Sequence, residues 1–154
     1  LNTSLLTLGS AAESGMLYIK NRESRNLIVK GIVVILGPST GGSTSDTTRI
    51  RIYRNPTTGT LISDATAVSM NQNRNFSSSK TLTADFYIAD GDGKTITGGD
   101  DIAQFFLPEI GRSFFTIGFE LGKGDVMGIE MVPPDDSSNT FYIAIICHVK
   151  DVNE

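Results

Sequence analysis

The sequence predicts an all-β protein, an antiparallel sandwich of two sheets, from two observations. Apolar and polar side chains alternate in four runs between residues 81 and 149, with the period of two that a strand with one buried face requires. Gly, Pro, Asn, Asp and Ser cluster between the runs, where they favour turns. No run has the period of an amphipathic helix of useful length, which argues against parallel strands joined by helices.

Segments rich in Gly, Pro and Asn mark the ends of the strands expected in the first half of the chain. Gly-Pro-Ser-Thr-Gly-Gly-Ser at 37–43 ends the second strand, and Asn-Pro-Thr-Thr-Gly at 55–59 ends the third. We therefore expect strands at 16–20, 26–36, 48–54, 61–63 and 67–70.

Turns also divide the second half. Asp-Gly-Asp-Gly at 90–93 predicts a turn in which glycine supplies positive φ, and Gly-Lys-Gly-Asp at 122–125 separates two long apolar rows. The strands expected here are 81–88, 94–97, 113–121, 126–132 and 140–150.

Unequal connections favour a jelly-roll-like version of the sandwich. The long connections at 37–47 and 98–112 are suited to crossovers between two sheets, whereas an up-and-down barrel has uniform hairpins. Within the second connection, we expect a short helix or a packed loop at 100–111. One domain is expected over 16–154, preceded by an extended N-terminal arm at 1–15.

The apolar rows predict the core. Side chains expected between the sheets are Phe86, Ile117, Phe119, Ile129, Ile143 and Ile145. A second, partly apolar surface is expected on the opposite rows, covered by a loop or by another copy of the chain, and its members are Tyr53, Tyr87, Phe114 and Tyr142.

Composition excludes several classes of partner. The 154 residues carry a formal charge of −4, which gives no basic field for direct binding of nucleic acid. The longest apolar stretch, residues 31–37, is the length of a strand, so no membrane span is predicted. Cys147 is the one cysteine, so it cannot form an internal disulfide, and its place on an apolar row predicts a buried thiol.

The first fifteen residues do not resemble an intact secretory signal, because they lack a positively charged region and a continuous apolar region. Small and polar residues surround Leu5, Leu6 and Leu8. This pattern predicts an arm that becomes ordered against a neighbouring subunit or a particle surface.

No catalytic site is predicted. His148 is the one histidine, and it follows Cys147 on an expected strand, where neighbouring side chains face opposite sides of the sheet. No serine lies in a nucleophile-elbow motif. We therefore expect that the protein is not an enzyme.

The acidic residues suggest a metal site only in part. Asp90 and Asp92 have the spacing of the first two ligands of a helical-hand calcium loop, but Lys94, Thr95 and Asp101 then stand where an oxygen ligand, a glycine and a glutamate are needed. A solvated turn is the simpler interpretation of this run, which also includes Asp100, and of the loop that contains Asp135 and Asp136. We expect no metal.

No cofactor is expected either. The glycine pairs at 41–42 and 98–99 lack the lysine and the strand-to-helix context of a phosphate loop. Aromatic residues make up 8% of the chain and tryptophan is absent, which weakens a carbohydrate-binding interpretation without excluding it.

Three segments resemble a known class of proteins. They are Asn-Leu-Ile-Val-Lys at 26–30, Asn-Pro-Thr-Thr-Gly-Thr-Leu-Ile-Ser at 55–63, and 71–99, where a polar Asn/Ser segment leads into Leu-Thr-Ala-Asp-Phe-Tyr and ends in Thr-Ile-Thr-Gly-Gly. The chain resembles the small jelly-roll virion proteins of tailed bacteriophages, of the decoration (cement), head-auxiliary or head-fibre class. No binding residues of that class can be carried over position by position.

The resemblance implies a structural virion protein without catalytic residues or cofactors. It implies that the protein binds the major capsid protein or other virion proteins, forms homo-oligomers, often trimers, and becomes part of the virion during assembly in the host cytoplasm. The alternative is a carbohydrate- or receptor-binding sandwich of a phage fibre or a cell surface. A concave site with an exposed aromatic residue and nearby Asp or Asn would favour the alternative, and a flat contact face continuous with neighbouring subunits would favour the shell role.

Overall fold

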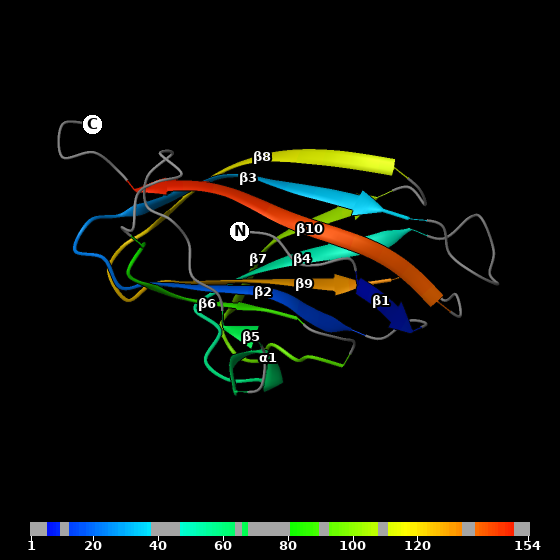
Figure 1. Cartoon of the computed structure of the whole chain (residues 1–154), viewed down its shortest axis with the longest axis horizontal. Helices are drawn as coiled ribbons and strands as arrows, with labels where there is room; N and C mark the ends of the chain where they lie inside the picture. The colour runs from blue at the N-terminus through cyan, green and yellow to red at the C-terminus, as the bar shows by residue number, and fades with distance from the viewer. Residues whose placement is uncertain are drawn as a thin grey trace.

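The computed structural model is a sandwich of two antiparallel sheets (Figure 1). The structure describes residues 6–9, 13–37, 47–63, 66–67, 81–89, 93–107, 111–133 and 138–149. The four-stranded sheet has the order β1 (Leu6–Gly9), β10 (Ser138–Val149), β3 (Leu27–Leu36), β8 (Gly111–Leu121). The six-stranded sheet has the order β5 (Thr66–Ala67), β6 (Ala84–Ile88), β2 (Ser14–Asn21), β9 (Val126–Val132), β4 (Thr48–Arg54), β7 (Asp100–Leu107). The all-β sandwich expected from the sequence is thus confirmed.

Strands pair in a nested order. β1 pairs with β10, β2 with β9, β3 with β8, and β4 with β7, all of them antiparallel. β3 and β4 belong to different sheets, and so do β7 and β8. The chain therefore passes between the sheets in the connections at 36–48 and 107–111, and it also does so in the connections that lead into β2, β3, β9 and β10.

The core lies between the two sheets and follows the predicted rows. Five of the six side chains expected there are buried, namely Phe86, Ile117, Ile129, Ile143 and Ile145. Phe119 packs against this core but is only half-buried. It lies near the end of β8, an edge strand among the described strands, so on one side no described strand covers it.

β2 and β9 are buried on both faces. The helical turn α1 (Thr60–Ser63) and the segment 93–97 lie on the side of the six-stranded sheet that faces away from the other sheet (Figure 1). A Cβ atom on Gly15 would lie 2.6 Å from Cγ1 of Ile96 and 3.1 Å from Cδ2 of Leu61. Glycine is therefore required at this position of β2, because any side chain would push the covering layer away.

The sequence prediction was wrong for three elements. Residues 100–107 form edge strand β7 rather than a short helix or loop. Residues 61–63 belong to α1 rather than to a strand. Residues 94–97 contribute one isolated bridge, between Thr97 and Thr58, and otherwise run as a covering segment.

The N-terminal segment contributes two described pieces. Leu6–Gly9 forms β1 at the edge of the four-stranded sheet, paired with β10 of the same chain. β2 begins at Ser14, two residues before the expected boundary of the domain. Whether residues 1–15 also contact a partner stays a prediction. In the described part of the chain, no helix has the length and apolar character needed to cross a membrane.

Candidate functional site: a pocket at one end of the sandwich

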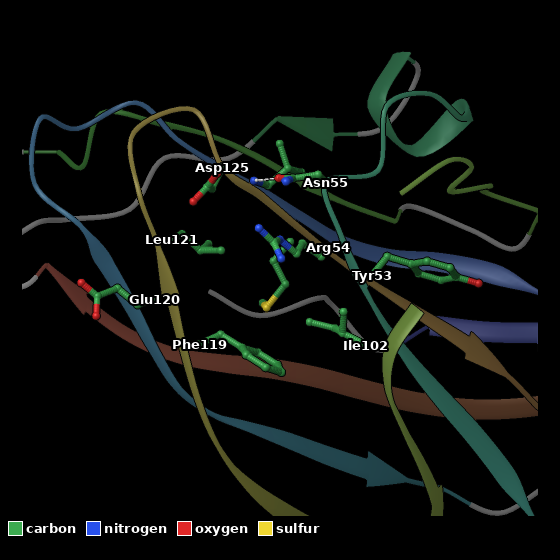
Figure 2. Close-up of a pocket in the computed structure, with 10 residues that line it drawn as sticks. Tyr53, Arg54, Asn55, Ile102, Phe119, Glu120, Leu121 and Asp125 are labelled. Atoms are coloured by element: carbon green, nitrogen blue, oxygen red, sulfur yellow. Dashed lines mark hydrogen bonds between the residues drawn. The ribbon is translucent and has the colours of Figure 1, made fainter. Parts of the chain in front are cut away.

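A pocket of about 340 Å³ opens at one end of the sandwich, where β4 and β8 finish and β9 begins (Figure 2). Edge strand β7 contributes one residue, Ile102, to its wall. The lining residues are Tyr53, Arg54, Asn55, Ile102, Phe119, Glu120, Leu121, Asp125, Val126 and Met127. Its volume is within the range that small ligands or single side chains of a partner occupy.

The inner part of the pocket is apolar. Leu121 and Met127 are buried, Phe119 is half-buried, and Ile102 is exposed. The register of the β4–β7 pair shifts between Ile52 and Tyr53, so β7 bulges beside Ile102. A bulge at a sheet edge redirects a side chain, which explains how a large apolar residue comes to line an open site.

Arg54 is the polar group at this site that is free to bind a ligand. It follows Ile50 and Ile52 on the inward row of β4, at the point where the sheets end. In the described part of the chain, its guanidinium makes no hydrogen bond or ion pair. Figure 2 shows the side chain beside the pocket. A guanidinium has five N–H donors in a fixed planar fork, so it can bind a carboxylate, a phosphate or hydroxyl groups.

The other polar groups hold the rim in place. Asn55 has a φ of 51°, and its Oδ1 accepts a hydrogen bond of 2.9 Å from the backbone N–H of Val126. Asp125 Oδ2 accepts a hydrogen bond of 2.9 Å from the N–H of Gly122 and closes the turn before β9. Glu120 accepts a hydrogen bond from the side chain of Asn26. Because these oxygens have partners, they position the rim and are only partly available to a ligand.

A charged network lies on the outer face of the six-stranded sheet. Arg51 forms ion pairs with Asp101 at 3.0 Å, Glu130 at 3.3 Å and Glu13 at 3.5 Å. The Tyr53 hydroxyl donates a hydrogen bond of 2.9 Å to Glu130 Oε2. The network links β4, β7 and β9, so it fixes the relative positions of these strands.

Glu130 is the buried member of this network, with only 3% of the residue exposed. Burial raises the pKa of Glu130 above its ordinary value, and the hydrogen bond from Tyr53 opposes this effect. Burial and the bond to Glu130 also raise the pKa of Tyr53. Tyr53 therefore stays protonated and continues to donate to Glu130 at neutral pH.

Those residues weighed in the sequence analysis that the structure describes do not come together into a site. Asp101 pairs with Arg51 and accepts a hydrogen bond of 2.7 Å from Gln104, and Asp100 begins β7. Cys147 packs against the core but is half-buried rather than buried as expected, and partial burial raises the pKa of its thiol. The His148 backbone pairs with Ile28, and its side chain is outside the described part of the structure. The predictions for Asp90, Asp92, Asp135 and Asp136 also fall outside the described residues.

The expected second apolar surface is divided between the two outer faces. Tyr53 and Tyr87 are on the six-stranded sheet, where the Tyr87 ring lies 5.6 Å from that of Tyr18. Phe114 and Tyr142 are on the four-stranded sheet. In the described residues, no cluster of three or more His, Cys, Asp or Glu side chains could hold a metal ion.

The sequence analysis missed the pocket and the charged network. The pocket has no local signal, because its lining comes from four strands that are far apart in the chain. The charged network does have a local signal in the sequence. In 48–54, Arg49, Arg51 and Tyr53 alternate with Ile50 and Ile52, which marks a polar row on a strand. Comparison with protein-family models and with curated proteins finds no match to this chain.

Proposed function

We propose that the protein is a non-enzymatic structural component of a virion, a decoration or auxiliary protein that binds the assembled shell and neighbouring subunits. The observation that carries the proposal is a broad apolar surface on the outer face of the four-stranded sheet. We call this surface the β3 face, and its members are Val33, Ile35, Arg112, Phe114, Tyr142, Ala144 and Ile146.

The β3 face exposes side chains that an isolated protein ordinarily buries. Phe114 is 55% exposed, Ile146 47% and Ile35 40%. They lie on three neighbouring strands, so they form one patch rather than scattered apolar residues. Contiguous apolar patches of this kind are typical of surfaces that contact another protein.

The frame behind this face suits a rigid building block. The nested strand pairing is the order that a jelly roll has, which supports the finer fold in the proposal. A third layer covers β2 and β9, so the six-stranded sheet has little freedom to bend. A broad apolar surface on a sandwich is suited to adhesion over a wide area, which supports the shell role that the resemblance implies.

Adding the protein back to particles tests this role. Purified protein is mixed with shells that lack it and is sedimented with them, beside the variant Ile146→Asp. We expect saturable co-sedimentation of the unchanged protein that is not inhibited by free sugars. Failure to bind shells at micromolar concentration would contradict the proposal.

The alternative function, recognition of a carbohydrate or receptor, is favoured by one specific observation. The pocket at the end of the sandwich places Phe119 beside Arg54, Asn55 and Asp125, the combination of an aromatic ring and polar groups that sugar sites use. A glycan array followed by titration with Arg54→Ala tests it. Glycan binding that is lost in this variant would establish the alternative. If no glycan on the array binds, the alternative is contradicted and the shell role stands as the proposal.

A further inference from the structure

We propose that the pocket at the end of the sandwich binds a neutral sugar that carries an N-acetyl group. This assignment rests on the alternative function above, carbohydrate recognition, and it narrows the ligand to one chemical class. The pocket shares no lining residue with the β3 face, so it can bind a sugar whether or not that face binds a shell. Three features of the pocket support the assignment: anchored polar groups, an apolar wall opposite them, and the charges around Arg54.

Two polar side chains at the rim are each anchored through one atom. The Asn55 N–H donates a hydrogen bond of 2.9 Å to the Val126 carbonyl, and Asn55 Oδ1 accepts one of 2.9 Å from the Val126 N–H. The Nδ2 group of Asn55 makes no hydrogen bond to another described residue, so it remains as a donor. Asp125 is held in the same way, because the Gly122 N–H bonds to Oδ2 and leaves Oδ1 as an acceptor. A ligand meets both groups already oriented, which lowers the entropic cost of binding.

Arg54 stands between these anchored groups and the apolar part of the pocket. In Figure 2, Asn55 and Asp125 lie on one side of the Arg54 side chain, and Phe119 and Ile102 lie on the other. Arg54 can only donate hydrogen bonds, and an ionised Asp125 can only accept them. Together they suit a ligand whose polar edge has both donors and acceptors, which is a property of sugar hydroxyls and of amides.

The apolar wall extends beyond its aromatic ring. Phe119 is half-buried, so part of its ring is accessible to the C–H face of a pyranose. Ile102, Leu121 and Met127 add aliphatic and thioether surface to the same cavity. A plain hexose has a hydroxyl group on most of its carbons and would place polar atoms against this surface. An N-acetyl group instead offers a methyl to the apolar wall and an amide to the polar side. The cavity of about 340 Å³ is at the lower end of the range for ligand sites, so it suits one sugar unit.

The charges around the pocket disfavour an acidic ligand. The β4–β7 register places Asp100 opposite Arg54, on the same face of the sheet, and Glu120 and Asp125 are at the rim. Carboxylates thus outnumber the cation at this end of the sandwich.

The sign of this charge separates two kinds of sugar. A uronic or sialic acid would add a further negative charge beside these carboxylates, which is unfavourable. A neutral N-acetylated sugar adds none, and its hydroxyl and amide N–H groups can donate to Asp125 Oδ1 while its oxygens accept from Arg54.

Titrations followed by NMR spectra of the full chain test the site. The probe is N-acetylglucosamine, compared with glucose and glucuronic acid. We expect N-acetylglucosamine to bind in the millimolar range and to shift the side-chain amide of Asn55 and backbone amides within 119–127. Glucose lacks the acetyl group and glucuronic acid adds a negative charge, so we expect each to bind about tenfold more weakly, or not at all.

Two variants separate the polar and apolar parts of the pocket. Arg54→Met removes the guanidinium and should weaken binding of N-acetylglucosamine about tenfold or more. Ile102→Ser, at a residue that is 41% exposed, should lower the preference for N-acetylglucosamine over glucose by about threefold or more, an effect that loss of folded protein would not produce. The matched control Arg112→Met removes a guanidinium from the β3 face and should bind the sugar as the unchanged protein does. Circular dichroism with thermal unfolding verifies that each variant folds.

Three results would overturn the inference: no shift within 119–127 at about 50 mM N-acetylglucosamine, equal affinity for glucose or glucuronic acid, or full affinity in Arg54→Met. Binding of other glycans only, lost in Arg54→Met, would keep the alternative function and overturn the N-acetyl assignment. Co-sedimentation with shells keeps the two surfaces apart, because Arg54→Met should bind shells as the unchanged protein does. A protein that binds the sugar in this pocket but no shell would contradict the shell role and support the assignment made here.

Discussion

At the scale of single residues, one buried carboxylate, that of Glu130, organises the ion pairs and hydrogen bonds on the outer face of the six-stranded sheet. Arg51 compensates the charge of Glu130, and the Tyr53 hydroxyl donates a hydrogen bond to its Oε2. Removing one partner of such a group is costly, because the buried charge then loses its compensation. We therefore expect Tyr53→Phe to lower the free energy of unfolding at pH 7 by about 1–3 kcal/mol, measured by urea denaturation. A change below about 0.3 kcal/mol would show that the hydroxyl is not needed.

The raised pKa of Glu130 predicts a direction of pH dependence. The folded protein holds this proton to higher pH than the unfolded chain does. The contribution of Glu130 to stability is therefore fully present below the ordinary glutamate pKa and is lost as the pH rises through the raised value. We expect Glu130→Gln to remove this loss, in denaturation curves recorded from pH 4 to pH 8. If the variant and the unchanged protein have parallel profiles, the carboxylate does not titrate as inferred.

Substitutions at Ile143 test the predicted core. This residue is fully buried on β10 and pairs with Val34 on β3. Ile143→Ala should lower the free energy of unfolding by about 2–5 kcal/mol, through lost burial and a cavity, and Ile143→Val by about 0.5–1.5 kcal/mol. Denaturant titration of both variants measures this series. A cost below about 0.5 kcal/mol for the alanine variant would place Ile143 outside the core.

At the scale of elements, the sequence predicted strands where one face is buried and failed where burial differs from that pattern. In β10, Ile143 and Ile145 alternate with half-buried or exposed neighbours, so the period of two was visible. In β7, Ile102 and Phe106 are exposed beside Phe105 and Leu107, so no alternation remained to be read. The α1 turn covers β2 from outside through Leu61, and this contact between distant segments has no signature within 61–63.

The role of β1 is testable by deletion. Four residue pairs join β1 to β10 at the edge of the four-stranded sheet. We expect removal of residues 1–12 to lower the free energy of unfolding by about 1–4 kcal/mol, since a few edge hydrogen bonds are lost at about 0.5–1.5 kcal/mol each. The remaining chain should still unfold cooperatively in a circular dichroism melt, and its assembly should weaken. Outright unfolding would make β1 an essential strand, and unchanged assembly would contradict the arm hypothesis.

At the scale of the whole molecule, the sandwich presents two surfaces that the sequence could not locate. The pocket joins the ends of four strands, and the β3 face depends on the register of β10, β3 and β8. Phe114 and Tyr142 were recognised as belonging to a second apolar surface, but their common sheet follows only from the strand order. Residue patterns thus predicted that an apolar outer surface exists, while topology decided which side chains share it.

The number of copies per particle tests the central claim most directly. Quantitative mass spectrometry on purified virions measures the ratio of this chain to the major shell protein. The account predicts a ratio that is a simple fraction of the shell subunits, as expected for a protein present in high copy number over the shell. A few copies per particle would point to a fibre, and absence from purified particles would contradict the structural role.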